Sequence, residues 1–374
     1  MSDTGGGHRA AAEAIMRALE HLEPAGGVRT VMVDFFRETF LPPFNRSGAT
    51  YRPMVNSIPW FWGFGFRATK PRPMRALMAG IEVLLGGRTM RHLFIHRNPD
   101  LVVSVHPLAT SWPCRILNRT WPGVPFVTVV TDLATGHPSW FSRCTDWCFV
   151  PSEAARQNAL EEGLRPERVV ITGLPIDLRF ATLPDPSAAA AIKAEYGAPP
   201  HKPLVLLVGG GEGMGNLEGY AGAIAEAGLD LALMVITGRN VALRQRLEQR
   251  QWPIPVIVTG FVRDMPRRMV AADAIVTKAG PGTLSEALAA GLPILVTGFI
   301  PGQEEGNVDW VVSSGAGRLT PDRASIQATL RDLFAGGRRT ARHDAMATAA
   351  RSLAHPNAAL EVAGRLLGLL DGTW

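Results

Sequence analysis

The chain has little cysteine and no long apolar run. Its three cysteines, Cys114, Cys144 and Cys148, cannot all pair, and the Cys-x-x-x-Cys spacing lacks the second cluster that a zinc site needs. We therefore expect reduced thiols, as in a cytoplasmic protein. No apolar stretch approaches the roughly 20 residues of a membrane-spanning helix, and no leader with a cleavage site opens the chain. We expect a protein that is neither secreted nor membrane-spanning.

The balance of apolar and charged residues is that of a folded protein. Apolar residues make up 46% of the chain and charged residues 19%, which excludes a disordered class. The length of 374 residues is ample for two domains, each with its own core. The formal net charge of +5 favours anionic partners, without choosing between nucleic acid, phosphate and lipid headgroups.

Aromatic and basic residues gather in one stretch. Trp60, Trp62 and Phe64 fall within a few positions of Arg67 and Lys70. Aromatic rings with adjacent cations suit the boundary between lipid headgroups and acyl chains, but they also fit an internal cluster with a solvated basic edge. These residues alone leave both interpretations open. Because the aromatics are bunched instead of spaced along a basic groove, we expect no nucleic-acid partner.

Short apolar runs alternate with helical patterns along the chain. The amphipathic pattern over 11–22 predicts a helix, and the apolar runs that end in polar or turn residues are typical of buried parallel strands. We expect strands within the following segments: 28–36, 101–107, 125–133, 146–152, 168–175, 203–216, 231–238, 254–262, 273–283 and 292–305.

A proline-rich stretch over 173–191 interrupts this alternation and indicates a linker. The predicted fold class is α/β, with two doubly wound Rossmann-like domains. We expect an N-terminal domain over 1–175, a linker over 176–200, a second domain over 201–350, and a helical segment over 351–374 that packs back on the N-terminal domain.

The chain opens on a glycine-rich loop with no strand before it. Gly5, Gly7 and Ala10 match the G-x-G-x-x-A form of the dinucleotide fingerprint, and Asp34 ends the next predicted strand, where a ribose-binding acid would lie. Without its preceding strand the first helix would lack a partner in the sheet. We expect a chain that begins at this loop to be poorly stable, and an added upstream apolar strand to restore it.

A second glycine-rich loop spans 209–216, between a predicted strand and a helix. It fits neither the dinucleotide fingerprint nor a Walker loop, but its bare backbone amides at a helix start would suit a diphosphate. A tight turn is the alternative for any single glycine loop. The candidates in this loop are Gly210, Gly211, Glu212 and Gly213.

Polar side chains follow two later strands in succession. Gly280 and Gly282 open a helix with Glu286 in its second turn, where a carboxylate can accept both hydroxyls of a ribose while loop amides meet phosphate. Gln303 and Glu304 stand at the start of the next predicted helix and can pair with several sugar hydroxyls. Because two polar helix starts follow successive strands, we favour a nucleotide-sugar site over a solvated surface.

Several long motifs, taken in order along the chain, resemble one family. They include "SDTGGGHRAAAEAI", "VVTDLATGHPSWF", "VGGGEGMG", "KAGPGTLSEALAAGLPI" and "GFIPGQEEGNVDWVVSSGAG". The chain resembles the monogalactosyldiacylglycerol synthase family over nearly its whole length. That family carries a strand before the opening loop, and here Met1 stands in its place.

The resemblance implies a fold and a reaction. The family has the type B glycosyltransferase fold and is related to the peptidoglycan N-acetylglucosaminyltransferase. It moves galactose from UDP-galactose to diacylglycerol with inversion, as a peripheral membrane enzyme. For this chain we expect a peripheral place on the cytoplasmic face of the membrane. Close relatives use UDP-glucose, and the sequence leaves the sugar open. The expected partners are therefore a UDP-sugar, diacylglycerol and an anionic lipid surface.

The resemblance also assigns roles to residues. It implies that His8 is the general base, that Glu286 binds the ribose, and that the donor domain supplies Gly210, Gly211, Glu212, Gly213, Gly280, Gly282, Thr283, Phe299, Gln303 and Glu304. The acceptor or membrane candidates are Gly6, Gly7, Trp60, Trp62, Phe64, Arg67, Lys70, Asp132 and His137.

These roles are chemically consistent. A neutral histidine can take the proton of a glycerol hydroxyl, and the helix N-terminus is expected to lower the pKa of His8 and keep it neutral. No Asp-x-Asp pair is present, so we expect no metal and no other cofactor, with loop amides stabilising the departing UDP. Asp132 and His137 either orient the acceptor or replace His8 as the base, or they are ordinary strand-end residues.

Three functions of other classes compete with this one. A soluble UDP-N-acetylglucosamine 2-epimerase could share the fold without a membrane surface. An NAD-dependent oxidoreductase would explain the opening loop and leave Glu286 and Gln303 without a role. A lipid-binding module would explain the aromatic stretch alone.

Overall fold

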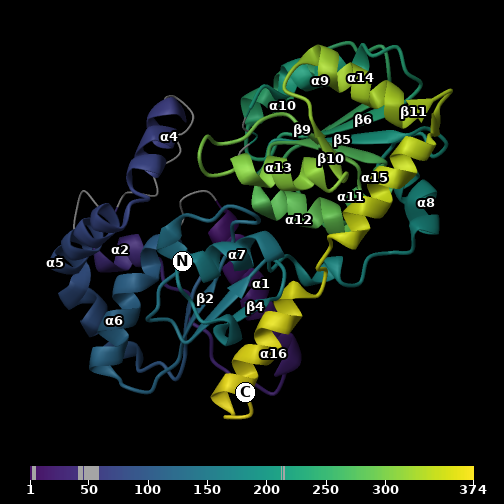
Figure 1. The fold of residues 1–374 in the computed structure, drawn as a ribbon. Coiled ribbons are helices and arrows are strands. Elements are labelled where there is room, and N and C mark those ends of the chain that lie inside the picture. Colours follow the sequence, from purple (N-terminus) through teal and green to yellow (C-terminus); the bar gives the residue numbers. More distant parts are fainter. Residues whose placement is uncertain (2–5, 41–44, 46–58, 212, 214) are drawn as a thin grey trace. The chain divides into compact units, whose positions relative to one another are not determined.

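A computed structural model describes residues 1, 6–40, 45, 59–211, 213 and 215–374. The described chain divides into two compact units (Figure 1). Unit 1 comprises Met1–Leu178, Ile300–Gly306 and Asn357–Trp374, and unit 2 comprises Arg179–Phe299 and Asn307–Pro356.

Unit 1 is built on a parallel sheet in the order β1-β2-β3-β4. Its central strands are buried on both faces, as the apolar runs predict. The strands are β1 (Val102–Ser104), β2 (Phe126–Val129), β3 (Trp147–Val150) and β4 (Val169–Ile171).

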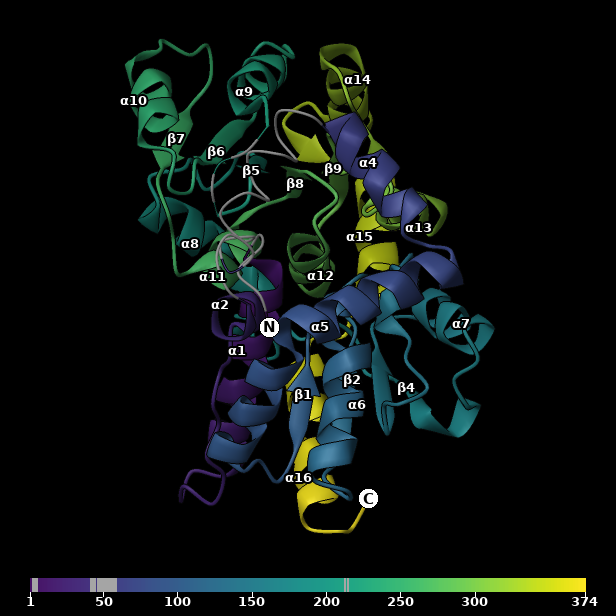
Figure 2. The ribbon, with the colours of Figure 1, turned by 90° about the vertical axis from the view of Figure 1, so that its left-hand side faces the viewer.

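Helices cover both faces of this sheet. Phe126 packs with buried residues of α5 and α6, whereas its neighbour Val127 packs with α1 and α16, because successive side chains of a strand point to opposite faces. Figure 2 shows α6 in front of the strands and α16 behind them. The helices of unit 1 are α1 (Gly7–Leu22), α2 (Phe35–Thr39), α4 (Pro59–Ala68), α5 (Arg72–Arg97), η2 (Pro107–Ala109), α6 (Ser111–Thr120), η3 (Pro138–Trp140), α7 (Glu153–Glu161), η4 (Pro166–Arg168) and α16 (Ala358–Leu370).

The strand predicted over 28–36 is wrong. In the structure residues 28–34 form no strand with any of the described residues, and α2 begins at Phe35. The backbone of this segment bonds instead to the first residue, since the Met1 amino group donates to the Val33 carbonyl and Phe35 N–H donates to the Met1 carbonyl, each at 2.9 Å. Asp34 accepts a hydrogen bond from Arg37 N–H and caps α2, which gives it a local role.

Unit 2 contains a larger parallel sheet in the order β10-β9-β8-β5-β6-β7. Val205 and Leu207 of β5 face a core formed with α9, α10 and α14, and Figure 1 shows α11 and α12 on the other side of the sheet. Its strands are β5 (Leu204–Val208), β6 (Ala232–Ile236), β7 (Val256–Thr259), β8 (Ala274–Thr277), β9 (Ile294–Val296) and β10 (Gly317–Leu319), and β11 (Phe334–Ala335) pairs with β12 (Arg338–Arg339).

The remaining helices precede these strands, lie between them or follow them. They are η5 (Leu178–Phe180), η6 (Pro186–Ala188), α8 (Ala189–Glu195), α9 (Leu217–Ala225), α10 (Val241–Gln249), α11 (Met265–Ala271), α12 (Pro281–Ala289), α13 (Glu305–Ser313), α14 (Arg323–Leu333) and α15 (Ala341–Ser352). No helix among the described residues has both the length and the apolar character needed to cross a membrane.

The expectation of reduced thiols is wrong for two of the cysteines. Cys114 on α6 and Cys144 before β3 form a disulfide, and their Cα atoms lie 6.1 Å apart, within the range that a disulfide spans. The two residues are 30 positions apart in sequence, so their spacing gave no sign of this pairing. Cys148 on β3 is free and buried, and burial raises the pKa of its thiol to about 12.

Candidate active site

The carboxyl ends of parallel strands meet at one edge of a sheet, and ligands of doubly wound folds bind there. In unit 1 this edge carries His8, in the first turn of α1, and Thr131, just after β2. Gly6 precedes the helix in the left-handed conformation, with φ of 83°. Among the described residues, no atom would lie within 4 Å of a Cβ at Gly7.

His8 is held by polar and aromatic neighbours. Its Nδ1 lies 2.8 Å from Thr131 Oγ1, and its ring centre lies 4.6 Å from that of His106 and 5.9 Å from that of Trp140. A hydrogen bond with the Val105 backbone also engages the ring. Neighbours on several sides fix the orientation of this imidazole.

The pKa of His8 is lowered to about 4. Burial is the largest cause, the charge of the Met1 amino group adds to it, and the hydrogen bond with Val105 opposes both. The sequence predicted the direction of this shift, but it assigned the cause to the helix N-terminus. His8 is therefore neutral at physiological pH, as a general base must be.

His137 serves the structure of its own loop. Its Nδ1 accepts a hydrogen bond from Ser139 N–H, so the ring proton is on Nε2, which lies 3.2 Å from Thr69 Oγ1. Thr69 in turn donates to the Gly65 carbonyl and is free to accept from His137. Burial, followed by the charges of Arg75 and Lys70, lowers the pKa of His137 to about 4. Both ring nitrogens of His137 are thus engaged, one with Ser139 and one with Thr69 of the turn after α4.

Asp132 is a buried carboxylate in the same loop. Trp140 Nε1 donates to its Oδ2 at 2.7 Å and thereby holds the indole next to His8. Burial raises the pKa of Asp132 to about 7, the bond from Trp140 lowers it, and the charge of Glu304 raises it. Asp132 therefore positions Trp140 and is partly protonated near neutral pH.

Segment Ile300–Gly306 belongs to unit 1 although it follows β9 of unit 2. Glu304 is 3% exposed, and its Oε2 accepts a hydrogen bond from Ile300 N–H at 2.9 Å, which closes the turn before α13. Gln303 is half-buried, and Phe299, the last residue before the segment, is 39% exposed. Gln303 and Glu304 thus precede α13, which begins at Glu305 and not at these residues.

In unit 2 the loop after β5 packs against the loop after β6. Gly210 and Gly213 have φ of 72° and 62°, and a Cβ at Gly213 would lie 2.0 Å from the Thr237 carbonyl oxygen. Gly213 is therefore required by close backbone approach as well as by its conformation. Gly211 lies in the same loop, at the carboxyl edge of the sheet, and Glu212 lies outside the described residues, as does Gly5 of the opening loop.

The loop after β8 opens α12 as predicted. Gly280 is the cap residue, Pro281 is the first helical residue, and a Cβ at Gly282 would meet nothing within 4 Å. Thr283 and Glu286 are half-buried on the first turns of α12. These residues lie on the edge of the unit 2 sheet that also carries the glycine loop after β5.

Sequence reasoning missed a stacked pair at this edge. The Arg239 guanidinium lies over the ring of Phe261, 4.5 Å from its centre, and both side chains are near the position of a Cβ at Gly211. Phe261 is 52% exposed, which is high for a large aromatic side chain. Their place after strands β6 and β7 was the only available signal. Thr131 and His106 were also missed, because a single threonine or histidine after a strand is common.

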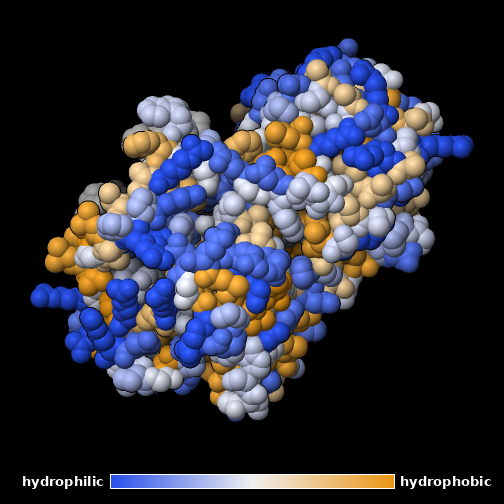
Figure 3. Space-filling view, in the orientation of Figure 1, coloured by the Kyte–Doolittle hydropathy of each residue, from blue (hydrophilic) through white to orange (hydrophobic). Residues whose placement is uncertain are grey.

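Exposed apolar side chains are concentrated on α4 and α5. Trp60 and Phe64, one helical turn apart on α4, are 71% and 67% exposed, whereas Trp62 is half-buried. Leu77, Ile81 and Leu84 line the outer face of α5, and Figure 3 shows apolar side chains gathered there. Arg67 and Lys70 are exposed at the end of α4 and just beyond it. The sequence pointed to α4 and missed the apolar face of α5.

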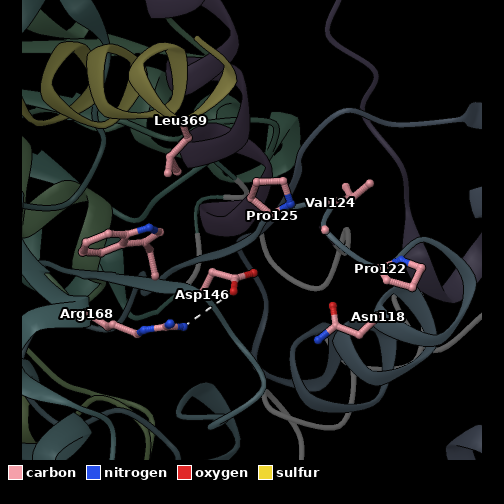
Figure 4. Close-up of a pocket in the computed structure, with 9 residues that line it drawn as sticks. Asn118, Pro122, Val124, Pro125, Asp146, Arg168 and Leu369 are labelled. Atoms are coloured by element: carbon pink, nitrogen blue, oxygen red, sulfur yellow. Dashed lines mark ion pairs between the residues drawn. The ribbon is translucent and has the colours of Figure 1, made fainter. Parts of the chain in front are cut away.

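A separate groove of about 480 Å³ lies at the opposite edge of the unit 1 sheet (Figure 4). Pro125, Asp146 and Arg168 line it from the positions just before β2, β3 and β4. Asp146 and Arg168 form an ion pair of 3.6 Å there. This groove is therefore remote from His8 and carries an already neutralised cation.

Two family models match the chain in succession. Monogalactosyldiacylglycerol (MGDG) synthase matches residues 8–176, and glycosyltransferase family 28 C-terminal domain matches residues 205–358. A probable monogalactosyldiacylglycerol synthase 2, chloroplastic, from Oryza sativa subsp. indica is 40% identical over 334 residues, which are 86% of this chain and 70% of the relative. Monogalactosyldiacylglycerol synthase 1, chloroplastic, from Arabidopsis thaliana is 36% identical over 371 residues, 97% of this chain and 68% of the relative.

The chain belongs to the monogalactosyldiacylglycerol synthase family. The family resemblance seen in the sequence is thereby confirmed.

Solved structures agree on the fold. A Staphylococcus aureus MnaA–UDP structure aligns with a TM-score of 0.57 at 19% identity, over 75% of this chain and 79% of that one. Acinetobacter baumannii MurG aligns with a TM-score of 0.54 at 16% identity, over 77% of this chain and 79% of that one. At such identities the likeness bears on the fold alone, and it confirms two Rossmann-like domains of the type B glycosyltransferase class.

Proposed function

We propose that this family member is an inverting glycosyltransferase that moves galactose from UDP-galactose to the free hydroxyl of 1,2-diacylglycerol, giving β-monogalactosyldiacylglycerol. The observation that carries the proposal is His8, a neutral, oriented imidazole at the carboxyl edge of unit 1, where the match to the synthase model begins. Removal of a proton from an acceptor hydroxyl needs an unprotonated base, and His8 is unprotonated near neutral pH.

His8 acts on the acceptor. As the hydroxyl oxygen of diacylglycerol forms its bond to the anomeric carbon, His8 takes the hydroxyl proton. The bond from the anomeric carbon to the UDP oxygen breaks on the opposite face, and UDP leaves with the electron pair. A single displacement of this kind inverts the anomeric centre.

Unit 2 binds the donor in this proposal. Backbone amides of the loop after β5 and of the start of α12 meet the diphosphate, and Glu286 accepts the ribose hydroxyls. Gln303 and Glu304, which belong to unit 1, are the residues that the family resemblance assigns to the sugar. The exposed ring of Phe261, with the Arg239 guanidinium on it, offers a flat face on which the uracil ring of UDP stacks. No metal takes part, since the chain has no Asp-x-Asp pair.

Galactose and glucose differ at one hydroxyl, and UDP-glucose is the rival donor. Donor binding can be tested by calorimetry with UDP, UDP-galactose and UDP-glucose. We expect Glu286→Gln to weaken binding of all three, because they share the ribose. Unchanged binding of UDP by this variant would remove Glu286 from the donor site.

We also propose that the enzyme binds peripherally to the cytoplasmic face of a membrane that contains anionic lipid. Trp60 and Phe64 on α4 and the outer face of α5 supply exposed apolar area, and the exposed Arg88 and Arg91 continue the α5 face as cations. Aromatic and aliphatic side chains would enter the interface while cations meet phosphates.

Vesicle co-sedimentation tests this membrane proposal. Binding should rise with anionic lipid and fall with salt, and replacing Trp60 and Phe64 by serine should weaken it while leaving UDP affinity unchanged. Serine at Val31, an exposed apolar residue elsewhere on unit 1, is the matched control and should leave vesicle binding unchanged. Loss of UDP affinity together with the fold would show that Trp60 and Phe64 stabilise the protein instead.

A further inference from the structure

Helix α4 has two faces with different neighbours. Trp60 and Phe64 lie on the exposed face. Gly63 and Phe66, three residues apart, lie on the face that packs against the rest of unit 1, and Gly63 is buried. The sequence explained only the exposed face.

The packed face of α4 contacts segment Ile300–Gly306. A Cβ at Gly63 would lie 3.0 Å from Pro301 Cβ, so the helix and the segment approach as closely as glycine allows. Gly302 has φ of 80°, and a Cβ there would lie 3.1 Å from Phe66 Cδ1. Two glycines, one on each side, therefore permit this contact.

An ion pair joins the same two elements. Arg67 Nη2 lies 3.0 Å from Glu305 Oε1 and 3.3 Å from Oε2. Both side chains are substantially exposed, so the pair serves mainly to fix the position of Glu305, the residue next to Glu304. Arg67, which the sequence assigned to the lipid surface, thus has a partner in the segment.

Helix α4 also contacts the loop that carries Asp132 and His137. The rings of Phe66 and His137 meet edge to face with centres 4.9 Å apart, and Thr69 Oγ1 lies 3.2 Å from His137 Nε2. The same helix therefore touches both the proposed sugar-binding turn and the loop beside His8.

We infer that α4 positions the sugar-binding turn, with Gly63, Phe66 and Arg67 acting as positioning residues for Gln303 and Glu304. This inference rests on the proposed donor role of those two residues. Displacing α4 should therefore weaken the affinity for the UDP-hexose. The turnover rate at saturation should change less, because Asp132, and not α4, holds Trp140 beside His8.

A matched pair of substitutions tests this. Gly63→Leu and Gly65→Leu place the same side chain on the same helix, but a Cβ at Gly65 meets none of the described atoms within 4 Å. We expect Gly63→Leu to raise the KM for the UDP-hexose about tenfold or more, with kcat changed much less, and Gly65→Leu to leave both within about twofold. Affinity for UDP, which lacks the sugar, should be unchanged in both. An unchanged KM in a folded Gly63→Leu protein would overturn the inference.

The ion pair provides a second test that does not depend on the folding of Gly63→Leu. Arg67→Glu and Glu305→Arg should each raise the KM for the UDP-hexose about two- to fivefold, the range expected of an exposed pair. The double variant should recover most of the loss, while its vesicle binding stays as weak as that of Arg67→Glu. Failure of the double variant to recover the KM would overturn the inference. If the wild type transferred no sugar, the proposed function would be refuted instead. The affinities of the same variants for the UDP-hexose, measured by calorimetry, would then test the inference on α4.

Discussion

His8 Nδ1 and Thr131 Oγ1 lie 2.8 Å apart, and this contact joins the first turn of α1 to the end of β2. The two residues are 123 positions apart in sequence. Thr131 is buried, so its hydroxyl has a restricted choice of partners. A threonine that fixes the ring of the proposed base is therefore a positioning residue in the proposed mechanism.

Replacing His8 by alanine should separate chemistry from binding. We expect transfer to slow by roughly 10²- to 10⁴-fold, the range typical of a lost general base, with the affinity for the UDP-sugar nearly intact. Steady-state kinetics with calorimetry would measure both. If His8→Ala transferred sugar at close to the wild-type rate, His8 would be a structural residue only.

Thr131 should affect the rate through the orientation of His8. Thr131→Val keeps the shape of the side chain but removes the hydroxyl, and we expect kcat to fall about tenfold with the KM for the donor unchanged. Thr131→Ser keeps the hydroxyl and should restore most of the rate. Equal rates for the valine and serine variants would argue against a positioning role.

The pH dependence of the rate should report the low pKa of His8. Since the pKa is about 4, the base stays unprotonated down to about pH 5, and kcat/KM should show no loss from His8 between pH 7 and 5.5. An unperturbed histidine with a pKa near 6.5 would reduce kcat/KM by almost tenfold over the same interval. Circular dichroism at each pH is the control for unfolding. An acid limb near pH 6.5 that disappears in His8→Ala would contradict this prediction.

Asp132 should make stability depend on pH in the opposite sense to an ordinary ion-paired carboxylate. Its pKa is raised to about 7 in the folded protein, so the folded state holds a proton that the unfolded state releases near pH 4. The contribution of Asp132 to the free energy of unfolding is fully present below about pH 4 and is lost as the pH rises to 7. Relative to Asp132→Asn, the wild type should lose about 1.4 kcal/mol of unfolding free energy per pH unit between pH 5 and 7. Urea unfolding curves that shift in parallel for both proteins would contradict this.

The parts of the fold that the sequence predicted are those with strong local signals. Runs such as 204–208 and 232–236 are apolar at every position, which is typical of a strand buried on both faces, and they form β5 and β6. The glycine loops before α9 and α12 were found because glycine and a helix start are visible locally. Residues 28–34 also contain a short apolar run, from Val31 to Val33, but a strand also requires a neighbour, and the described residues provide only Met1.

The other discrepancies all involve contacts between distant residues. The Cys114–Cys144 disulfide, the bond from Thr131 to His8 and the place of segment Ile300–Gly306 in unit 1 depend on chain folding that no short pattern encodes. Arg67 illustrates the same limit, because the sequence assigns it to the lipid surface and gives no sign of its ion pair with Glu305.

The most direct test is to incubate the protein, with chelator present, with diacylglycerol vesicles that contain anionic lipid and with labelled UDP-galactose or UDP-glucose in parallel. Chromatography and anomeric analysis of the lipid product follow. We predict a β-linked monogalactosyldiacylglycerol from UDP-galactose, formed without added metal and reduced by at least about a hundredfold in His8→Ala. The proposed reaction would be contradicted if neither donor gave a glycolipid. It would also be contradicted if His8→Ala formed as much product as the wild type.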